Sequence, residues 1–443
     1  MNAASRLLLV GEIIVDFSLP TPTRESRLRL GGIVHAARGL WAAGADFSIA
    51  AVCPRYLLAQ AREYLNELGC KEFIWLAEVS GAPNVMAIGD PTETADQGYE
   101  DLLRDEKTVA FRDEAKALNS YQRCLVFPGK FDLEQLANLL NAEAKVSFDI
   151  AYDLASLDPL AGFKGRIAAL ITSTSSQLFL DNGAERFEGF LKKLKKLSPS
   201  AILLKENRGG SRVFDMFAKE VDEVPAQLGE TVNSVGVGDV YSAVFAEHIP
   251  YGVSEAAWIG ARAATCYSQT TFPDDFKRDV QRSLSLSQEQ MRGLGGTFLP
   301  WHDRQNYQIY FAAPDFSYVE RKELDQALAA LEYHNFRIRR PVQENGELDL
   351  PSAQHELTRT YLADVALLEE CDLVFALPLG RDPGTLVEMG MAMTTHKPVI
   401  TYDPSSENTN TMVMAGSTVY STNLDTCLNG VFDAMSKLRA DRK

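Results

Sequence analysis

The 443-residue sequence lacks the cysteine and histidine patterns that mark metal sites and disulfide frameworks. It has only six cysteines and six histidines, no two cysteines have the C-x-x-C spacing, and no cysteine stands near a histidine at metal-ligand spacing. Each cysteine lies in an apolar segment, so we expect buried free thiols, a reducing compartment and no protein-bound metal. The six are Cys53, Cys70, Cys124, Cys266, Cys371 and Cys427.

Long apolar runs and positive charge are also scarce. No stretch reaches the roughly 20 apolar residues that a membrane-spanning helix needs. The run Leu7–Val10 is followed by Glu12 and Asp16, which is typical of a first strand and not of a signal peptide. The sequence has 44 Lys and Arg against 60 Asp and Glu, whereas nucleic-acid binders usually carry a basic face. We therefore expect a cytoplasmic protein with no membrane or nucleic-acid partner.

Short apolar strands alternate with helices over the first 270 residues. Strands are predicted at 6–17, 47–52, 124–127, 145–150, 168–172 and 201–205, and helices at 35–44, 240–248 and 254–267. This alternation favours a mostly parallel α/β sheet. Regular signals weaken between Thr270 and Asn306, where glycine and proline gather, so we predict a boundary near residue 300. The two predicted domains cover residues 1–295 and 305–443.

A second alternation predicts that the later domain is a smaller α/β unit. Strands at 309–312, 336–342, 373–377, 399–402 and near 419 are predicted to alternate with helices at 320–334, 354–371, 383–395 and 424–438. This pattern is typical of a doubly wound parallel sheet of flavodoxin or Rossmann type. Such folds bind ligands at the carboxyl ends of their strands.

The strand, loop and helix at residues 377–393 carry the strongest functional signal. Asp382 precedes Pro383, as an N-cap precedes a proline at the first helical position. Glu388 follows in the second turn among apolar residues, which predicts a helix buried on all sides. A lone carboxylate there is unfavourable unless it is partnered or used, and the helix N-terminus is expected to keep it ionised. Two structural readings stay open: Asp382 as a cap only, and Glu388 paired with Arg381.

The order of polar residues in this domain resembles a known family. Tyr310 ends the first strand, Asp364 lies in a helix, and Asp372 starts the next strand. Asp382 and Glu388 are six residues apart. This order, over about 135 residues, resembles the nucleoside 2-deoxyribosyltransferases. The resemblance implies an enzyme that needs no cofactor and cleaves N-glycosidic bonds of nucleosides or nucleotides.

The resemblance also implies a role for each residue. Glu388 would be the nucleophile that attacks C1′ of the sugar, and Tyr310 would orient it by a hydrogen bond. Asp382 would bind a sugar hydroxyl, and Asp364 would protonate the departing base, because an anionic base is a poor leaving group. Asp372 is interpreted as a structural residue at the strand start.

Family members place an Asn-x-Met element near the sugar 5′ end, often from a neighbouring subunit. Asn410 and Met412 fit this element, and Met414 offers a competing register. The resemblance therefore also implies a homo-oligomer.

The first domain carries a glycine turn that could bind an anion. Gly236, Val237 and Gly238 stand at the start of a predicted helix, where backbone N–H groups converge, and Asp239 follows them. The sequence resembles the Gly-Ala-Gly-Asp signature of the ribokinase-like (PfkB-type) sugar and nucleoside kinases. Further matches over residues 5–270 are Gly11 to Asp16, Gly31 and Gly32 before a helix, and Gly209-Gly210 after a strand.

This second resemblance implies a three-layer α/β fold with a sugar or nucleoside pocket. Asp16, Gly31 and Gly32 would contact the substrate, Asp239 would be the catalytic base, and ATP and Mg²⁺ would be cofactors. Two of the departures from the family pattern weaken the kinase reading. Thr172 to Ser176 has no carboxylate where the family carries Asn-x-x-Glu, and no asparagine follows the double glycine. Loss of a magnesium-organising carboxylate disfavours phosphoryl transfer, so a ligand-binding or scaffolding domain is favoured over a working kinase.

Three hypotheses follow for the whole chain. The first is an enzyme of nucleosides or nucleotides that passes a (deoxy)ribose to another base or to water, with a first domain that binds a sugar or nucleoside. The second is a bifunctional kinase and transferase in nucleoside salvage. The third is a sensor or effector, for instance in phage defence, that depletes a nucleotide pool when its first domain binds a signal.

Overall fold

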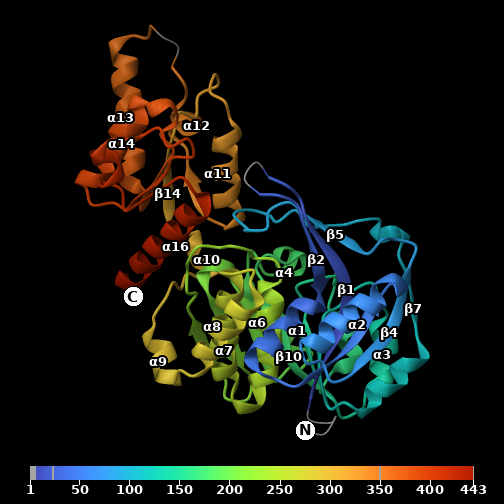
Figure 1. The fold of residues 1–443 in the computed structure, drawn as a ribbon. Coiled ribbons are helices and arrows are strands. Elements are labelled where there is room, and N and C mark those ends of the chain that lie inside the picture. Colours follow the sequence, from blue (N-terminus) through green and yellow to red (C-terminus); the bar gives the residue numbers. More distant parts are fainter. Residues whose placement is uncertain (1–5, 22–23, 349–350, 443) are drawn as a thin grey trace. The chain divides into compact units, whose positions relative to one another are not determined.

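The computed structural model describes residues 6–21, 24–348 and 351–442. In it the chain divides into two compact units. Unit 1 comprises Met1–Thr92, Gln97–Gln227 and Thr231–Gly296, and unit 2 comprises Thr297–Lys443 with the short segments Glu93–Asp96 and Leu228–Glu230. Both units are built on a largely parallel sheet, so the predicted α/β class is confirmed (Figure 1).

The main sheet of unit 1 has the strand order β13-β12-β11-β10-β9-β8-β1-β3-β4-β7. The strands from β11 to β4 pair in parallel, and β12, β13 and β7 are antiparallel additions at the edges. The bounds are β1 Leu7–Ser18, β3 Phe47–Cys53, β4 Phe73–Ser80, β7 Thr108–Phe111, β8 Arg123–Val126, β9 Lys145–Asp149, β10 Ile167–Ser173, β11 Ala201–Lys205, β12 Ser211–Asp215 and β13 Glu220–Val224.

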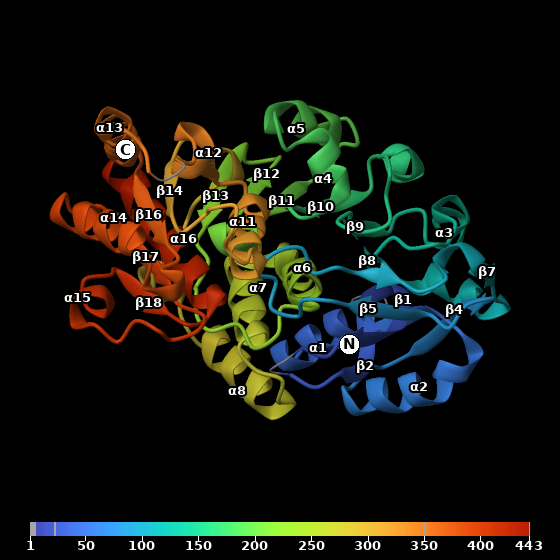
Figure 2. The same ribbon diagram turned by 90° about the horizontal axis from the view of Figure 1, so that it is seen from above.

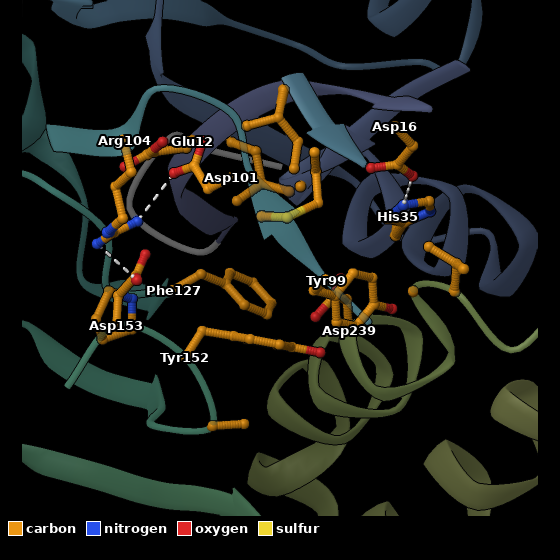
Figure 3. Close-up of a pocket in the computed structure, with 18 residues that line it drawn as sticks. Glu12, Asp16, His35, Tyr99, Asp101, Arg104, Phe127, Tyr152, Asp153 and Asp239 are labelled. Carbon is orange, nitrogen blue, oxygen red and sulfur yellow. Dashed lines mark hydrogen bonds and ion pairs between the residues drawn. The ribbon is translucent and has the colours of Figure 1, made fainter. Parts of the chain in front are cut away.

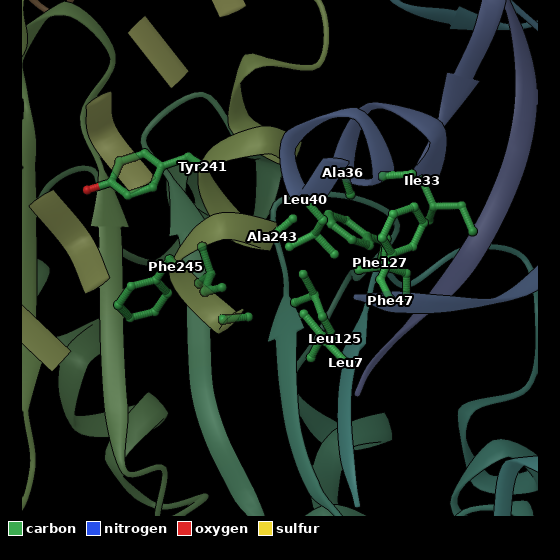
Figure 4. Packing of buried hydrophobic residues seen from close by; sticks show 14 of the residues in the cluster. Leu7, Ile33, Ala36, Leu40, Phe47, Leu125, Phe127, Tyr241, Ala243 and Phe245 are labelled. Atoms are coloured by element: carbon green, nitrogen blue, oxygen red, sulfur yellow. The ribbon is translucent and has the colours of Figure 1, made fainter. Parts of the chain in front are cut away.

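Helices cover both faces of this sheet (Figure 2). One face carries α1 (Ile33–Ala43), α2 (Leu58–Glu67), α6 (Val237–His248), α7 (Val253–Ser268) and α8 (Pro273–Leu284), and the other carries α3 (Leu133–Leu139), α4 (Gln177–Asn182) and α5 (Phe187–Lys195). Figure 4 shows the first face, where Leu7, Phe47 and Leu125 of the sheet pack against Leu40 of α1 and Phe245 of α6. Burial of this apolar surface is the main contribution to the stability of such layers.

The segment after Thr270 is more regular than its glycines and prolines predict. Helices α8 and α9 (Gln288–Gly293) lie in it. Phe276 and Val280 of α8 are buried in a cluster with α6 and α7, so tertiary packing stabilises a helix whose sequence signal is weak.

Strand β1 belongs to two sheets. Residues 7–12 pair with β3 in the main sheet, whereas residues 13–18 pair with β2 (Arg27–Gly32). Residues 15–18 also pair with β5 (Val85–Ile88), which in turn pairs with β6 (Glu100–Asp101). Glu12 and Asp16 therefore lie on either side of the place where β1 passes from one sheet to the other.

Unit 2 has a five-stranded sheet of order β15-β14-β16-β17-β18, and every neighbouring pair is parallel. Its bounds are β14 Gln308–Ala312, β15 Arg337–Arg339, β16 Leu373–Ala376, β17 Val399–Tyr402 and β18 Val419–Ser421. Helices α11 (Lys322–Tyr333) and α16 (Leu424–Asp441) pack on one face, and α13 (Gln354–Glu370) and α14 (Pro383–Thr394) on the other. The predicted doubly wound sheet is confirmed, with its first strand between the second and the third.

One strand of unit 2 is shorter than predicted. The expected strand at 336–342 is reduced to β15, because Pro341 begins the short helix α12 (Pro341–Asn345). Within the described ranges, no helix of either unit is both long and apolar enough to cross a bilayer. All six cysteines are buried free thiols, as predicted.

Candidate functional site

In unit 2 the structure brings Tyr310 and Glu388 together. The Tyr310 hydroxyl donates a hydrogen bond of 2.6 Å to Oε1 of Glu388. Tyr310 lies in the middle of β14 and Glu388 lies in α14, which follows β16. Strand order reverses between β14 and β16, and doubly wound sheets bind their ligands at this switch point.

Local sequence explains this geometry. Side chains alternate along β14, so Ile309 and Phe311 pack toward α11 and α16 while Tyr310 packs toward α13 and α14.

Asp382 caps α14: its Oδ2 accepts bonds from the backbone N–H of Thr385 at 2.7 Å and from the Thr385 hydroxyl at 2.9 Å. Asp382 therefore acts as a helix cap, which was one of the two interpretations left open by the sequence. Its Oδ1 does not take part in these two bonds.

The helix α14 is not buried on all sides, contrary to the prediction. Met389 and Ala392 are buried against the sheet, whereas Val387 is 58% exposed and Gly390 is also exposed. The helix covers only one face of the sheet, so its outer side has no sheet to pack against. The alternative pairing of Glu388 with Arg381 is also absent, because Nε of Arg381 donates to the carbonyl of Glu407.

The environment of Glu388 favours a proton on its carboxyl group. Burial raises its pKa to about 7, the Tyr310 hydrogen bond opposes this rise, and the charges of Asp364 and Asp382 add to it. The helix N-terminus was expected to help keep Glu388 ionised, and loss of solvent acts in the opposite direction. At neutral pH the two protonation states are close in free energy.

Asp364 lies near enough to Glu388 and Tyr310 for its charge to raise the pKa of both. It sits in α13, and Nδ2 of Asn345 donates to its Oδ1 at 2.8 Å. Burial raises the pKa of Asp364, and the bond from Asn345 opposes this. Asn345 was not anticipated from the sequence, where it stands three residues after a predicted strand with no motif around it.

The loop that carries Asn410 is held by a buried carboxylate. Oδ2 of Asp403 accepts bonds from the Tyr420 hydroxyl at 2.6 Å and the Asn408 N–H at 2.9 Å. Oδ1 of Asn410 accepts from the N–H of Met412 at 2.8 Å, so Asn410 caps the short helix α15 (Thr411–Met414). Asn410 and Met412 are exposed, and neither makes a hydrogen bond to Glu388.

Asp372 takes the structural role predicted for it. Its Oδ2 accepts from the N–H of Gln308 at 2.8 Å, and Oδ1 pairs with Arg442. This carboxylate therefore joins the starts of β14 and β16.

In unit 1, Asp239 lies at the N-terminus of α6 and is 7% exposed. Its Oδ1 is buried without a hydrogen-bond partner in the described part of the chain. Burial raises the pKa of Asp239 well above its usual value, and the nearby charge of Asp149 adds to the rise while Lys205 opposes it. A buried acceptor without a hydrogen bond lowers the stability of the folded state, and a ligand hydroxyl would donate the missing hydrogen bond.

Only part of the predicted anion hole is available. Gly236 has φ +82°, and a Cβ there would lie 2.2 Å from the His35 ring, so only glycine fits. The N–H of Val237 donates to the carbonyl of Ser234 at 3.1 Å and is not free to bind a ligand. The carbonyl of Gly238 faces the Lys205 ammonium at 3.2 Å.

Lys205 was not anticipated from the sequence. Its Nζ also donates to Oδ2 of Asp149 at 2.8 Å and to the Ser242 hydroxyl at 3.0 Å. The sequence feature that could have indicated its role is its position as a lysine at the end of the apolar strand β11. This buried ion pair lies beneath the first turn of α6.

Asp16 is held by a histidine. Oδ2 of Asp16 accepts from Nε2 of His35 at 2.8 Å and from Nε of Arg29 at 3.4 Å. Burial lowers the pKa of His35 to about 4, so the ring is neutral, and its Nε2–H donates a hydrogen bond to Asp16. A Cβ on Gly31 would lie 1.9 Å from Oδ1 of Asp16, which explains glycine at that position.

A cavity of about 400 Å³ connects these residues. Glu12, Ile14 and Asp16, alternate residues of β1, line it together with Gly32 and Asp239. Gly31 and Gly238 are not among the lining residues, and Gly236 is. The volume lies in the range of small-molecule sites.

The residues after β10 do not fit the magnesium ion that the kinase resemblance implies. The Ser173 hydroxyl bonds to Ser175, and Ser176 caps α4 through the N–H of Phe179. No carboxylate stands in this turn, and across the described ranges no three His, Cys, Asp or Glu side chains are arranged to hold a metal. No phosphoryl-transfer step is therefore derived for this unit.

The pKa of Glu388 predicts a pH-dependent effect of its neutral analogue. A carboxyl group whose pKa rises on folding destabilises the folded state as pH increases from 4.5 to about 7. Glu388→Gln is thus expected to stabilise unit 2 by up to about 3 kcal/mol at pH 8 and to have no effect at pH 4. Hydrogen exchange of the β14 and β16 amides measures this opening free energy. Glu369→Gln, at an exposed position of α13, is the matched control, and equal effects of the two variants at pH 8 would contradict the pKa.

Comparison with known proteins agrees with the geometry of unit 2. Residues 309–427 match the family model of nucleoside 2-deoxyribosyltransferase. No protein with curated annotation matches the chain in sequence.

Three solved structures that resemble the chain are kinases. A Methanocaldococcus jannaschii nucleoside kinase of the ribokinase family is 16% identical with a TM-score of 0.45, and the match covers 64% of this chain and 100% of that one. Arabidopsis thaliana ribokinase, solved with ribose and ATP, is 16% identical with a TM-score of 0.46 over 64% and 100%. Adenosine kinase from Sinorhizobium meliloti is 13% identical with a TM-score of 0.48 over 63% and 99%. The resemblance of the C-terminal segment to the nucleoside 2-deoxyribosyltransferases is confirmed by the family match over residues 309–427.

Proposed function

We propose that residues 305–443 cleave the N-glycosidic bond of nucleosides or nucleotides through a covalent sugar intermediate on Glu388. The observation that carries this proposal is the 2.6 Å bond from Tyr310 to Glu388 at the switch point of the sheet. A carboxylate with one oxygen fixed by a phenol presents its other oxygen in a defined direction, which nucleophilic attack requires.

The proposed reaction has two steps. Glu388 attacks C1′ of the sugar, a C1′–O bond forms, and the C1′–N bond breaks with its electron pair going to the base. Asp364 gives a proton to the departing base, and its raised pKa favours the protonated form that this role needs. Water or a second base then attacks C1′, the C1′–O bond to Glu388 breaks, and the proton of the attacking water or base returns to Asp364.

Glu388→Ala is expected to abolish release of free base from a panel of deoxynucleosides and deoxynucleotides while the fold is retained. The reason is that no other described side chain hydrogen-bonds to Tyr310 in its place. Chromatography of the products measures release, and Glu369→Ala is the matched control. Base release by Glu388→Ala at the unsubstituted rate would rule out the nucleophile assignment.

The hydroxyl of Tyr310 is expected to set the pH profile of the same reaction. Only ionised Glu388 attacks, so kcat/KM should rise with pH through about 7. Tyr310→Phe removes a bond that lowers this pKa, and the acid limb should move upward by about one pH unit. Tyr318→Phe, at a position 78% exposed, is the control. A lower rate with an unmoved limb would mean that Tyr310 does not act through Glu388.

We also propose that unit 2 binds a second copy of this chain. Exposed apolar side chains gather on the helices that carry the site: Tyr361 and Leu362 on α13, Val387 on α14 and Met412 on α15. The predicted sugar ligand Asn410 makes no bond to Glu388 in its own chain, which supports a role in a neighbouring site. Leu362→Glu should shift sedimentation velocity toward monomer and reduce base release, and a monomeric unsubstituted chain with full activity would refute this.

For residues 1–295 we propose ligand binding with slow or no phosphoryl transfer. Asp239 remains in position to bind a hydroxyl, but the magnesium-organising carboxylate is missing. Loss of one such charge typically lowers a rate by about a hundredfold. The bifunctional kinase is the second candidate, favoured by the unpartnered Oδ1 of Asp239. ADP formation at ordinary kinase rates, abolished by Asp239→Asn, would decide for it.

A further inference from the structure

The cavity of unit 1 has polar groups at two ends and aromatic side chains between them (Figure 3). Asp16 and His35 lie at one end in this view. Glu12, Asp101, Arg104 and Asp153 lie at the other end, which we call the distal end. Tyr99, Tyr152 and Phe127 lie between the two ends. Such a middle section suits a flat ring that packs against aromatic faces.

The cations of the distal end are already neutralised. Arg104 pairs with Asp101 at 3.0 Å and with Asp153 at 2.7 Å. Lys107 is buried and pairs with the second oxygen of Asp101 at 2.5 Å. Three carboxylates, counting Glu12, thus face these two cations, and the nearby Lys130 ammonium already donates to the Arg104 carbonyl. The distal end therefore does not suit a phosphate group, which needs unpaired cations or N–H donors.

Glu12 offers an acceptor to the cavity. Its Oε1 accepts from the backbone N–H of Lys130 at 2.8 Å, and a Cβ on Gly129 would lie 2.5 Å from this oxygen. The position of Oε1 is therefore fixed by backbone. Among the described residues, Oε2 has only a distant ion pair with Lys107, at 3.9 Å. Glu12 lines the cavity and its side chain is 12% exposed, so its second oxygen is the one left to bond with a ligand there.

We propose that this cavity binds a nucleoside whose base carries an amino group, and that Glu12 accepts a hydrogen bond from that amino group. The base lies among Tyr99, Tyr152 and Phe127, and the sugar hydroxyls lie toward Asp16 and Asp239. Burial raises the pKa of Glu12, which agrees with a carboxyl group that lacks strong compensation until a donor binds. The inference deepens the binding role proposed for residues 1–295 and does not depend on the reaction of residues 305–443.

Glu12→Gln provides a test with a defined direction. The Lys130 N–H needs an acceptor, so the amide oxygen of glutamine takes the place of Oε1. The amide NH₂ then takes the place of Oε2, and the cavity gains a donor where it had an acceptor. The substitution should therefore invert the preference between an amino group and a carbonyl at the same ring position.

The experiment uses the full chain with Glu388→Gln, so that bound nucleosides are not consumed. Calorimetry measures adenosine against inosine and cytidine against uridine, with ribose 5-phosphate as an anionic probe. Ala151→Phe fills the cavity, so the nucleoside binding that this variant loses is the binding at the cavity. We expect the amino compound of at least one pair to bind this cavity about tenfold tighter, as one mismatched hydrogen bond predicts, and ribose 5-phosphate to bind more weakly still.

In Glu12→Gln the preference should reverse, whereas Glu100→Gln, at an exposed position of β6, should leave it unchanged. An unchanged preference in Glu12→Gln, or tighter binding of ribose 5-phosphate than of any nucleoside, overturns the inference. If Ala151→Phe removes no nucleoside binding, both the inference and the binding role of residues 1–295 fail. Base release, measured separately with Glu388 present, then still decides the function of residues 305–443.

Discussion

The hydrogen bond between Tyr310 and Glu388 joins a buried strand to a helix that is open to solvent on one side. Its two partners have opposite requirements. Tyr310 needs the interior of the sheet to be fixed, and the role proposed for Glu388 needs access to a substrate. The first turn of α14 meets both requirements, because Asp382 and Pro383 start the helix immediately after the strand-end loop. The Tyr310–Glu388 contact exists only as long as this helix start is maintained, so the helix cap and the proposed catalysis rely on the same short segment.

The two units use a similar arrangement for different carboxylates. In each, a buried acid near the N-terminus of a helix has a raised pKa, Glu388 in α14 and Asp239 in α6. In each, desolvation is the largest cause. The difference lies in the partner: a phenol fixes Glu388, whereas Oδ1 of Asp239 has no partner among the described residues. This difference supports the roles proposed for them, directed attack for Glu388 and the binding of a hydroxyl for Asp239.

Sequence patterns predicted most strands, because strands depend on local periodicity. The pairing of Tyr310 with Glu388 was implied by the resemblance to the nucleoside 2-deoxyribosyltransferases and not by periodicity. Sequence patterns missed α8, whose helical signal is weak and whose stability comes from contacts with α6 and α7. They also missed the exposed side of α14, since composition alone cannot say which faces are covered.

Side chains that meet only through tertiary structure were missed for the same reason. Lys205 and Asp149 are 56 residues apart and form an ion pair beneath α6. Asn345 reaches Asp364 from a different helix. The protonation state of Glu388 could not be predicted either, because it depends on the balance between burial and one hydrogen bond.

The passage of β1 from one sheet to another has a consequence for ligand length. Glu12 and Asp16 lie on the same side of one strand, four residues apart, which corresponds to about 13 Å at the usual rise of a strand. Neighbouring strands hold both halves of β1, so this separation cannot adjust to a shorter or longer molecule. The backbone therefore selects compounds by their span before any side chain distinguishes their chemistry. A free pentose is too short to contact both carboxylates at once.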